Sequence, residues 1–136
     1  MKYFDPIRRK TISATPEEEI RQTVITWLLE TKKVPRHAME TEFSLARLER
    51  GNANRVDIMI HRFREGASVR EPWLLVECKC TEKSSWELLQ VQINKYLRVI
   101  RPQYLMLSLG NDWRFLEQTE DAQSYRPIPE LPEYPA

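Results

Sequence analysis

Glycine is scarce in this chain, with three residues among 136, and they stand far apart in the sequence. The chain therefore contains no P-loop, no glycine-rich dinucleotide-binding loop and no Gly-x-Ser-x-Gly turn around a nucleophilic serine. These absences exclude the usual sequence signatures of ATPases, of dinucleotide-dependent enzymes and of α/β-hydrolase enzymes.

Cysteine is scarce as well, since the chain has only Cys78 and Cys80, two positions apart on an expected strand. That spacing holds their Cα atoms near the upper limit for a disulfide, so we expect two free thiols. A zinc site with His37 or His61 is the weaker alternative, because Cys-x-Cys lacks the paired spacings of structural zinc sites. Small buried side chains are the favoured interpretation of both cysteines.

Long hydrophobic runs and a strong excess of one charge are also missing. No stretch approaches the length of a membrane span and the N-terminus has no signal-peptide pattern, which predicts a cytoplasmic protein without membrane contact. The formal net charge is +1, so overall charge gives no support to nucleic-acid binding, and any recognition of phosphate must be local. The length of 136 residues allows one domain with a real core.

The nine prolines fall almost wholly between periodic segments and so divide the chain. We predict an N-terminal arm over residues 1–14, with a short ordered piece around Tyr3 to Ile7, and a single domain over residues 15–120. The proline-rich tail over residues 121–136 is expected to be extended or disordered.

Two segments have helical periodicity. The first is expected to begin after Thr15, a suitable N-cap, with Pro16 in the first turn and Glu18 completing a capping box, and to end before Pro35. The second is expected to run from a cap at Ser84 or Ser85 to about Ile100.

Four segments are typical of β-strands, and a fifth is the expected hairpin partner of the last; they span residues 38–48, 55–63, 73–80, 104–109 and 113–118. The resulting order is helix, three strands, helix and two strands. This order predicts an α/β sandwich with a mixed sheet.

Three charged residues at the ends of expected strands carry the functional interpretation. Asp57 opens a strand on the face opposite Val56, Ile58 and Ile60. Glu77 and Lys79 close the apolar run that begins at Trp73, and on a strand they point the same way while Cys78 points the other. A carboxylate at the buried end of an apolar strand is costly as plain core, and a surface ion pair contributes under about 1 kcal/mol.

Two carboxylates and an amine that converge can hold a divalent ion and activate a water, which indicates a nuclease. We predict Mg²⁺ or Mn²⁺ on Asp57 and Glu77, with Lys79 orienting the water or stabilising negative charge at phosphorus. The structural alternatives are a surface Asp57, or one paired with Arg55, and a Glu77–Lys79 ion pair.

The first helix offers a further carboxylate. Glu17 lies near the middle of the apolar stripe, Glu18 is occupied by capping, and Glu19 faces solvent. Glu17 is therefore favoured over Glu18 as the helix residue that reaches the metal. The structural alternative is an ion pair between Glu17 and Arg21.

On the second helix, Gln92 and Tyr96 are four residues apart on the flank of the apolar stripe and could face the Glu77–Lys79 end. The alternative is a surface Gln and an amphipathic Tyr at the edge of the core. A basic cluster could contact phosphates or be a solvated helix face, and it comprises Lys83, Lys95, Arg98 and Arg101.

Together these segments resemble the N-terminal nuclease-type domain of type I restriction enzyme R proteins, within the PD-(D/E)xK nuclease superfamily. The matching pieces occur in family order from residue 5 to about residue 118, and they are Asp5-Pro-Ile-Arg-Arg-Lys10, Pro16-Glu-Glu-Glu-Ile-Arg-Gln22, Arg55-Val-Asp57, Val76-Glu-Cys-Lys79, Gln92-Ile-Asn-Lys-Tyr96 and Tyr104 to Gly110. The resemblance implies a restriction-endonuclease-like core of helix, three strands, helix and strand, with a mixed central sheet flanked by helices.

The resemblance also implies residue roles. Asp57 and Glu77 correspond to metal ligands, Lys79 to the catalytic lysine, and Glu17 or Glu18 to the helix carboxylate. Gln92 and Tyr96 match a motif that supports nucleotide or phosphate contact in related enzymes. The implied activity is Mg²⁺-dependent hydrolysis of DNA, with DNA, subunits of a restriction system and a second copy of the chain as candidate partners.

The chain departs from the family pattern at two points. Val56 stands before the motif Asp, where the superfamily pattern has Pro. Type I R proteins carry an ATP-driven translocase after this domain, and nothing in these residues corresponds to one, so ATP-dependent restriction is not implied for this chain acting alone.

A non-catalytic module that binds nucleic acid or protein is the alternative function, motivated by the near-neutral charge and small size.

Overall fold

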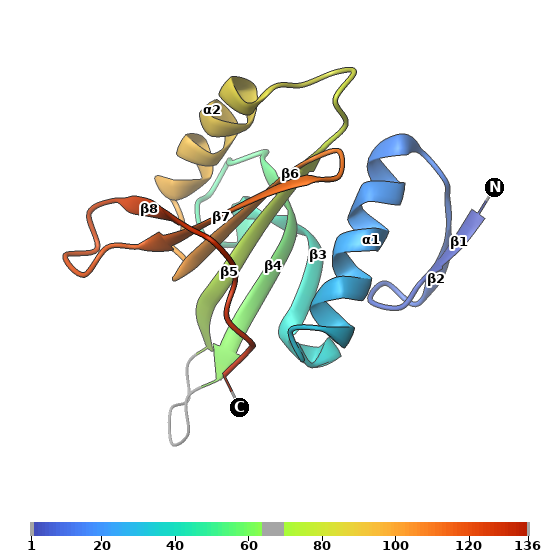
Figure 1. Cartoon of the computed structure of the whole chain (residues 1–136), viewed down its shortest axis with the longest axis horizontal. Helices are drawn as coiled ribbons and strands as arrows, with labels where there is room; N and C mark the ends of the chain where they lie inside the picture. Colours follow the sequence, from blue (N-terminus) through green and yellow to red (C-terminus); the bar gives the residue numbers. More distant parts are fainter. Residues whose placement is uncertain (1, 64–69, 136) are drawn as a thin grey trace.

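The computed structural model describes residues 2–63 and 70–135. Within these residues, two α-helices accompany a six-stranded mixed sheet, and a two-stranded hairpin stands apart from it (Figure 1). The predicted α/β class with a mixed sheet is therefore confirmed. Among the described helices none is long and apolar enough to cross a membrane.

The segment expected to be an N-terminal arm is a folded antiparallel hairpin. Strand β1 (Lys2–Asp5) pairs with β2 (Lys10–Ser13) along their whole length. The Asp5 side chain is fully buried and accepts bonds from the backbone N–H groups of Ile7 and Arg8 at 2.8 and 3.0 Å, which stabilises the turn. The hairpin is therefore more ordered than the sequence pattern indicates.

Helix α1 (Pro16–Glu30) begins where the sequence predicts. The Oγ1 atom of Thr15 accepts a bond from the N–H of Glu18 at 3.1 Å, and Pro16 occupies the first turn. Val24, Ile25 and Leu28 are fully buried against the sheet. The helix therefore presents one apolar side to the core.

Six strands lie side by side in sequence order across the main sheet: β3 (Met39–Ser44), β4 (Arg55–Phe63), β5 (Arg70–Lys79), β6 (Tyr104–Leu109), β7 (Asp112–Gln118) and β8 (Tyr125–Ile128). β5 and β6 are parallel and the other neighbouring pairs are antiparallel. Helix α2 (Trp86–Leu97), capped by Ser85, forms the crossover between the parallel strands.

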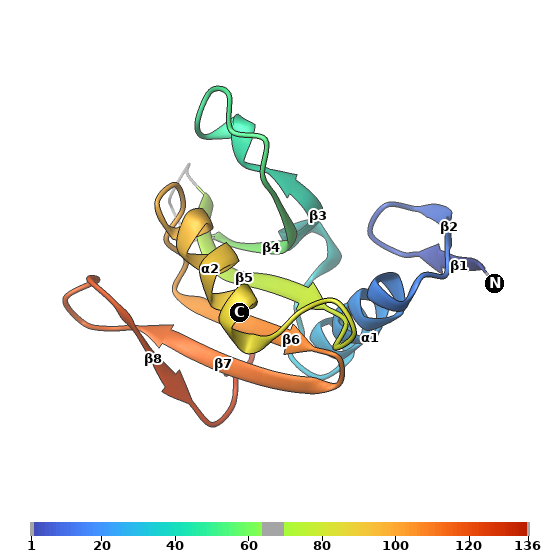
Figure 2. The ribbon, with the colours of Figure 1, turned by 90° about the horizontal axis from the view of Figure 1, so that it is seen from above.

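The two helices belong to two separate cores on opposite faces of the sheet (Figure 2). Leu74 and Val76 of β5 pack in the cluster that contains the α1 residues, whereas Leu75 packs with the α2 residues Leu89 and Ile93. Alternate side chains of a strand point to opposite faces, so α1 and α2 sandwich the middle of the sheet.

The strand expected over residues 38–48 is shorter than predicted. A 3₁₀ turn (Arg36–Ala38) precedes β3, and a second one (Leu45–Arg47) follows it. The Oγ atom of Ser44 accepts a bond from the N–H of Ala46 at 3.3 Å and so caps the second turn. The side chain of Leu45 is still fully buried, which explains why the strand pattern continued past Ser44.

The tail is extended, as one of the two expectations had it, and the alternative of a disordered tail is wrong. β8 pairs with β7, the side chain of Leu131 is fully buried, and the Tyr134 hydroxyl donates to the carbonyl of His61 at 2.8 Å. Prolines are compatible with this segment because β8 is an edge strand, where a missing N–H leaves no partner unpaired. The sheet therefore extends across the boundary expected at residue 120.

Both cysteines are free thiols, as predicted. Cys78 is buried in the α1-side core, whereas Cys80 is partly exposed beyond the end of β5. The expectation of burial therefore fits Cys78 alone.

Candidate functional site

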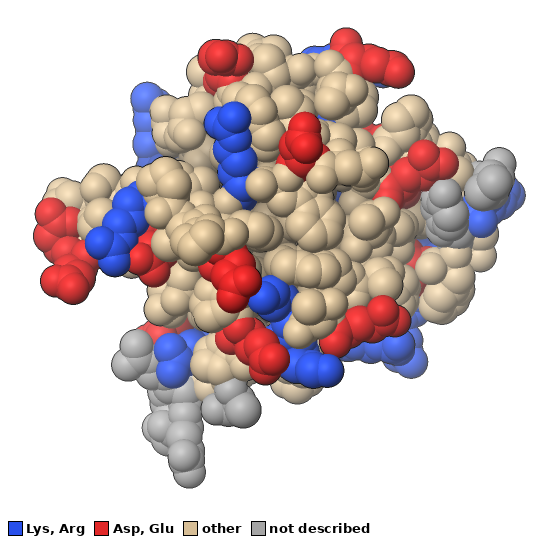
Figure 3. All heavy atoms as spheres, viewed as in Figure 1, with Lys and Arg blue, Asp and Glu red and all other residues tan. Residues whose placement is uncertain are grey.

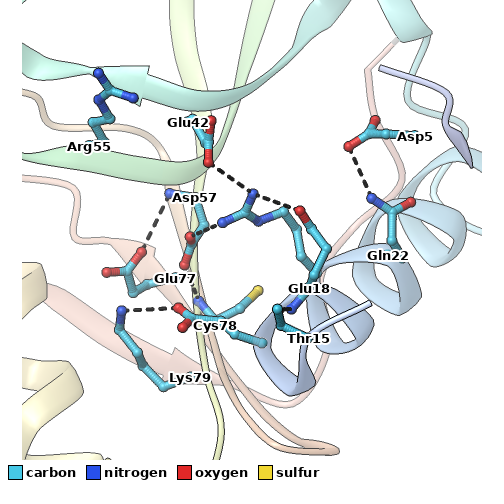
Figure 4. A network of polar contacts seen from close by, with 12 residues as sticks. Asp5, Thr15, Glu18, Gln22, Glu42, Arg55, Asp57, Glu77, Cys78 and Lys79 are labelled. Carbon is cyan, nitrogen blue, oxygen red and sulfur yellow. Dashed lines mark hydrogen bonds and ion pairs between the residues drawn. The ribbon is translucent and has the colours of Figure 1, made fainter. Parts of the chain in front are cut away.

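The carboxylates of Asp57 and Glu77 meet where β4 and β5 stop pairing. The backbone register ends with Ile58 facing Val76. One residue further, the N–H of Asp57 donates to Glu77 Oε1 at 3.4 Å, and the N–H of Cys78 donates to Asp57 Oδ2 at 2.7 Å (Figure 4). Each carboxylate therefore pairs with a buried backbone donor that the strand ladder leaves open.

The side chains of β4 stop alternating regularly between the two faces of the sheet at Asp57. Ile58 and Ile60 pack in the α1-side core, but Val56 packs with Phe43 in the α2-side core. The neighbouring strand has an irregularity at the same level, because Glu42 has a φ of 51°. The prediction that Val56 shares a face with Ile58 and Ile60 is therefore wrong, and this backbone rotation lets Asp57 reach a side chain of α1.

Glu77 is almost completely buried, with 1% of its surface exposed. Its burial and the neighbouring charge of Asp57 raise the pKa of Glu77 to about 9. At neutral pH the carboxyl therefore keeps its proton unless a cation lies close to it.

This carboxylate pair fits a divalent ion of the Mg²⁺ type. Two adjacent carboxyls that cannot both ionise gain from a shared cation, and Mg²⁺ is usually held by one or two carboxylates together with waters and phosphate oxygens. No three Asp, Glu, His or Cys side chains within the described residues come together to hold a metal. The described residues thus offer two carboxylates, and an ion held there would need its other ligands from water or phosphate.

Lys79 lies beside the pair and is held by α1. Its Nζ atom is 3.1 Å from Glu17 Oε1. Burial alone would lower the pKa of Lys79, but the charge of Glu77 and the hydrogen bond to Glu17 outweigh that effect and raise it. Lys79 is therefore a fixed positive charge at neutral pH.

The two helix glutamates have different partners from those expected. Glu17 contacts Lys79, and the Glu17–Arg21 pair considered as the alternative is not formed among the described residues. The Glu18 carboxylate contacts Arg8 and Arg21, and its Oε2 atom is buried without a partner in the described part of the chain. The second half of the predicted capping box is therefore wrong, because these guanidinium groups take the carboxylate that would return to Thr15.

Arg21 is the residue that the sequence pattern left out of the site. Its Nη2 atom lies 2.9 Å from Asp57 Oδ1, and its side chain is 10% exposed. An Arg on the buried stripe of a helix, three residues after Glu18, was the available signal. Its partner on β4 could not be found from spacing, because 36 residues separate them.

Gln92 and Tyr96 lie at the Glu77 end of α2. The Tyr96 hydroxyl is 2.8 Å from Glu77 Oε2 and 2.9 Å from the carbonyl of Arg55, and Gln92 Nε2 donates to it at 2.7 Å. Tyr96 is 1% exposed, and its burial raises the pKa of its hydroxyl, which stays neutral. Tyr96 therefore contacts Glu77 directly from inside the core, and half-buried Gln92 contacts Tyr96.

Comparison with protein families matches residues 16–132 to the type I restriction enzyme R protein N terminus. The match spans both α-helices, the six-stranded sheet and every candidate site residue, while the β1–β2 hairpin precedes it. The same comparisons match no curated protein and no solved structure to the chain.

Proposed function

We propose, because this chain belongs to the family of type I restriction enzyme R protein N termini, that it is a metal-dependent nuclease domain that hydrolyses DNA phosphodiester bonds. The observation that carries this proposal is that Asp57 and Glu77 converge where β4 and β5 stop pairing, with Lys79 beside them. The family also supports DNA and the other subunits of a restriction system as its partners.

Asp57 and Glu77 would hold Mg²⁺ or Mn²⁺, which when bound polarises the scissile phosphate and lowers the pKa of a coordinated water. Glu77 must release its proton to act as a ligand, because a metal competes with protons for a carboxylate.

Lys79 would act by charge. Its raised pKa makes it a hydrogen-bond donor throughout the neutral range, suited to stabilising negative charge that develops on the phosphate oxygens. Glu17 restricts the position of its Nζ atom through the 3.1 Å contact. General-base catalysis by Lys79 does not fit this protonation state.

Tyr96 and Gln92 would act through Glu77. The Tyr96 hydroxyl donates toward Glu77 Oε2, and Gln92 orients that hydroxyl. The resemblance implied a contact with phosphate, but a side chain that is 1% exposed supports a positioning role inside the protein instead.

Cleavage of supercoiled plasmid DNA by the purified chain, with Mg²⁺ or Mn²⁺, tests the proposal. We expect Lys79→Ala to lower the rate by about a hundredfold or more, because it removes a charge aimed at the reacting phosphate. Lys10→Ala changes an exposed lysine on β2, away from the carboxylate pair and from the basic cluster, and should cleave like the wild type. Equal cleavage by Lys79→Ala and the wild type, with both folded by circular dichroism, would contradict the assignment.

One observation favours the alternative of a non-catalytic binding module. The charged groups are paired within the protein, Asp57 with Arg21 and Lys79 with Glu17. That alternative predicts no heat of Mn²⁺ binding in calorimetry and no cleavage of single- or double-stranded DNA or RNA. Saturable Mn²⁺ binding that Asp57→Asn abolishes would reject it.

Contact with DNA would depend on local groups. On the face shown in Figure 3, basic and acidic side chains are interspersed. Within the basic cluster suggested by the sequence, Arg101 donates to the carbonyls of Ala122 and Gln123, so it also has a structural role. A shallow salt dependence of DNA binding is the expected result for a chain whose formal net charge is +1.

A further inference from the structure

Arg21 is a buried cation surrounded by three carboxylates, those of Glu18, Glu42 and Asp57. Its Nη2 atom lies 2.9 Å from Asp57 Oδ1, and its Nη1 atom lies 3.5 Å from an oxygen of Glu18 and 3.5 Å from an oxygen of Glu42. A buried guanidinium requires negative charge nearby, and here the requirement can be met without Asp57.

We propose that Arg21 is the internal counter-ion of the metal site. It holds Asp57 when no divalent ion is bound, and it turns to Glu18 and Glu42 when Asp57 takes up the ion. This inference rests on the proposed function, since it takes Asp57 to be a metal ligand. Arg21 is thus a positioning residue, which acts through Asp57 and sets the affinity of the site for the metal.

Two buried atoms without hydrogen-bond partners support the proposed position in which Arg21 turns toward Glu18 and Glu42. Glu18 Oε2 is buried and has no hydrogen-bond partner among the described residues, and the same holds for Arg21 Nε. One is an acceptor and the other a donor, and they belong to side chains already in contact through Arg21 Nη1 and Glu18 Oε1. Buried polar atoms are rarely left unpaired, so a guanidinium rotated toward Glu18 would satisfy groups that the present position leaves open.

The N-terminal hairpin limits how much negative charge Glu18 can offer. Arg8, in the β1–β2 turn, contacts Glu18 and lies 3.9 Å from Glu42. Buried Asp5 holds Arg8 Nε at 2.7 Å and so fixes Arg8 over α1. The carboxylates that receive Arg21 are therefore shared with a second guanidinium, and this sharing keeps Arg21 on Asp57 in the metal-free protein.

Mn²⁺ affinity of the full chain, measured from the free-ion signal in electron paramagnetic resonance, tests the inference without any activity assay. Arg21→Gln removes the competing cation, so we expect it to bind Mn²⁺ about tenfold more tightly or better than the wild type. Arg21→Lys keeps a cation within reach of Asp57 and should return the affinity most of the way to the wild-type value.

Arg55→Gln is the charge-matched control. Arg55 is exposed, lies two residues from Asp57 and points away from its carboxylate in Figure 4. Screening by salt should limit the effect of this variant to roughly threefold. An Arg21→Gln variant that binds Mn²⁺ no better than Arg55→Gln would overturn the counter-ion role.

A second measurement, on the wild-type chain, tests the inference even when Arg21→Gln does not fold. In the wild-type chain, the Nε–H resonance of Arg21, assigned by its loss in Arg21→Lys, should shift on titration with Mg²⁺ as Nε gains Glu18 as an acceptor. An Arg21 resonance that stays in place while Mg²⁺ saturates the site would overturn the inference alone. A wild-type chain and variants that all bind no divalent ion would overturn the proposed function as well.

Discussion

At the scale of single residues, Glu77 determines the charge of the site. Its burial beside Asp57 gives it a pKa of about 9, whereas an exposed Glu has a value of 4.5. Folding therefore makes Glu77 bind a proton that the unfolded chain has released at neutral pH. Stability from a raised carboxyl pKa is fully present below the unfolded value and is lost as the pH rises toward the folded value.

The metal-free chain should accordingly lose stability between pH 7 and pH 9, by roughly 2 kcal/mol if Glu77 dominates this range. Glu77→Gln has no carboxyl proton to lose at this position, so its free energy of unfolding should fall much less over the same range. A small loss near pH 9 remains in both proteins, because burial raises the pKa of the Cys78 thiol. Urea unfolding in the presence of a chelator measures both proteins.

The titration of His61 does not interfere between pH 7 and pH 9. Burial lowers the pKa of this imidazole, so its effect on stability is confined to acidic conditions. Parallel pH profiles for the wild type and Glu77→Gln would show that Glu77 is ionised in the folded chain.

At the scale of elements, the β1–β2 hairpin depends on one carboxylate. Burial alone would raise the pKa of Asp5, but the N–H groups of Arg8 and Ile7 and the Arg8 guanidinium together lower it. Gln22 of α1 donates to the same carboxylate at 3.0 Å, so Asp5 also fastens the hairpin to the helix.

Asp5→Ala should lower the free energy of unfolding by roughly 2–4 kcal/mol, because it leaves Arg8 and Gln22 without their buried acceptor. Ser13→Ala, at an exposed position of β2, is the control and should change stability by under about 0.5 kcal/mol. Chemical denaturation at neutral pH makes the comparison. Similar midpoints for the two variants would mean that the hairpin does not rely on Asp5.

At the scale of the whole molecule, the C-terminal segment closes the α1-side core. Leu131 packs in the same cluster as Leu28 of α1 and Ile60 of β4, and the N–H of Tyr134 donates to the carbonyl of Lys32 at 2.8 Å. Residues distant in sequence therefore form one hydrophobic core.

Leu131→Ala should destabilise the protein by about 2–5 kcal/mol, the usual cost of emptying a buried leucine site. Leu48→Ala is a matched control, since Leu48 is 54% exposed and should contribute under about 0.5 kcal/mol. Thermal and urea unfolding would compare them. A loss at Leu131 no larger than at Leu48 would mean that the tail detaches without cost.

Local patterns explain what the sequence predicted. The Thr15 cap, the Ser85 cap and the apolar runs of β5 and β6 depend on neighbours within a few residues, and each lies where it was expected. The convergence of Asp57 and Glu77 also followed, because both lie at the ends of adjacent strands.

Long-range pairing explains what the sequence could not predict. The tail has a composition typical of extended chain, and only the free edge of β7 makes it a strand. For Arg21 the sequence offered only Glu17, one turn away, as an alternative partner, but burial placed it among carboxylates from α1, β3 and β4. Such pairings depend on the shape of the finished sheet, which no local spacing encodes.

The order of the strands leaves β3 and β8 at the two margins of the sheet. Glu42, with a φ of 51°, distorts the outer backbone of β3, and Pro127 removes an N–H from β8. Open strand margins invite pairing with other chains, and distortion and proline are two means by which proteins prevent it. Neither margin therefore offers a regular template for another strand, which protects the sheet from fibril-like stacking.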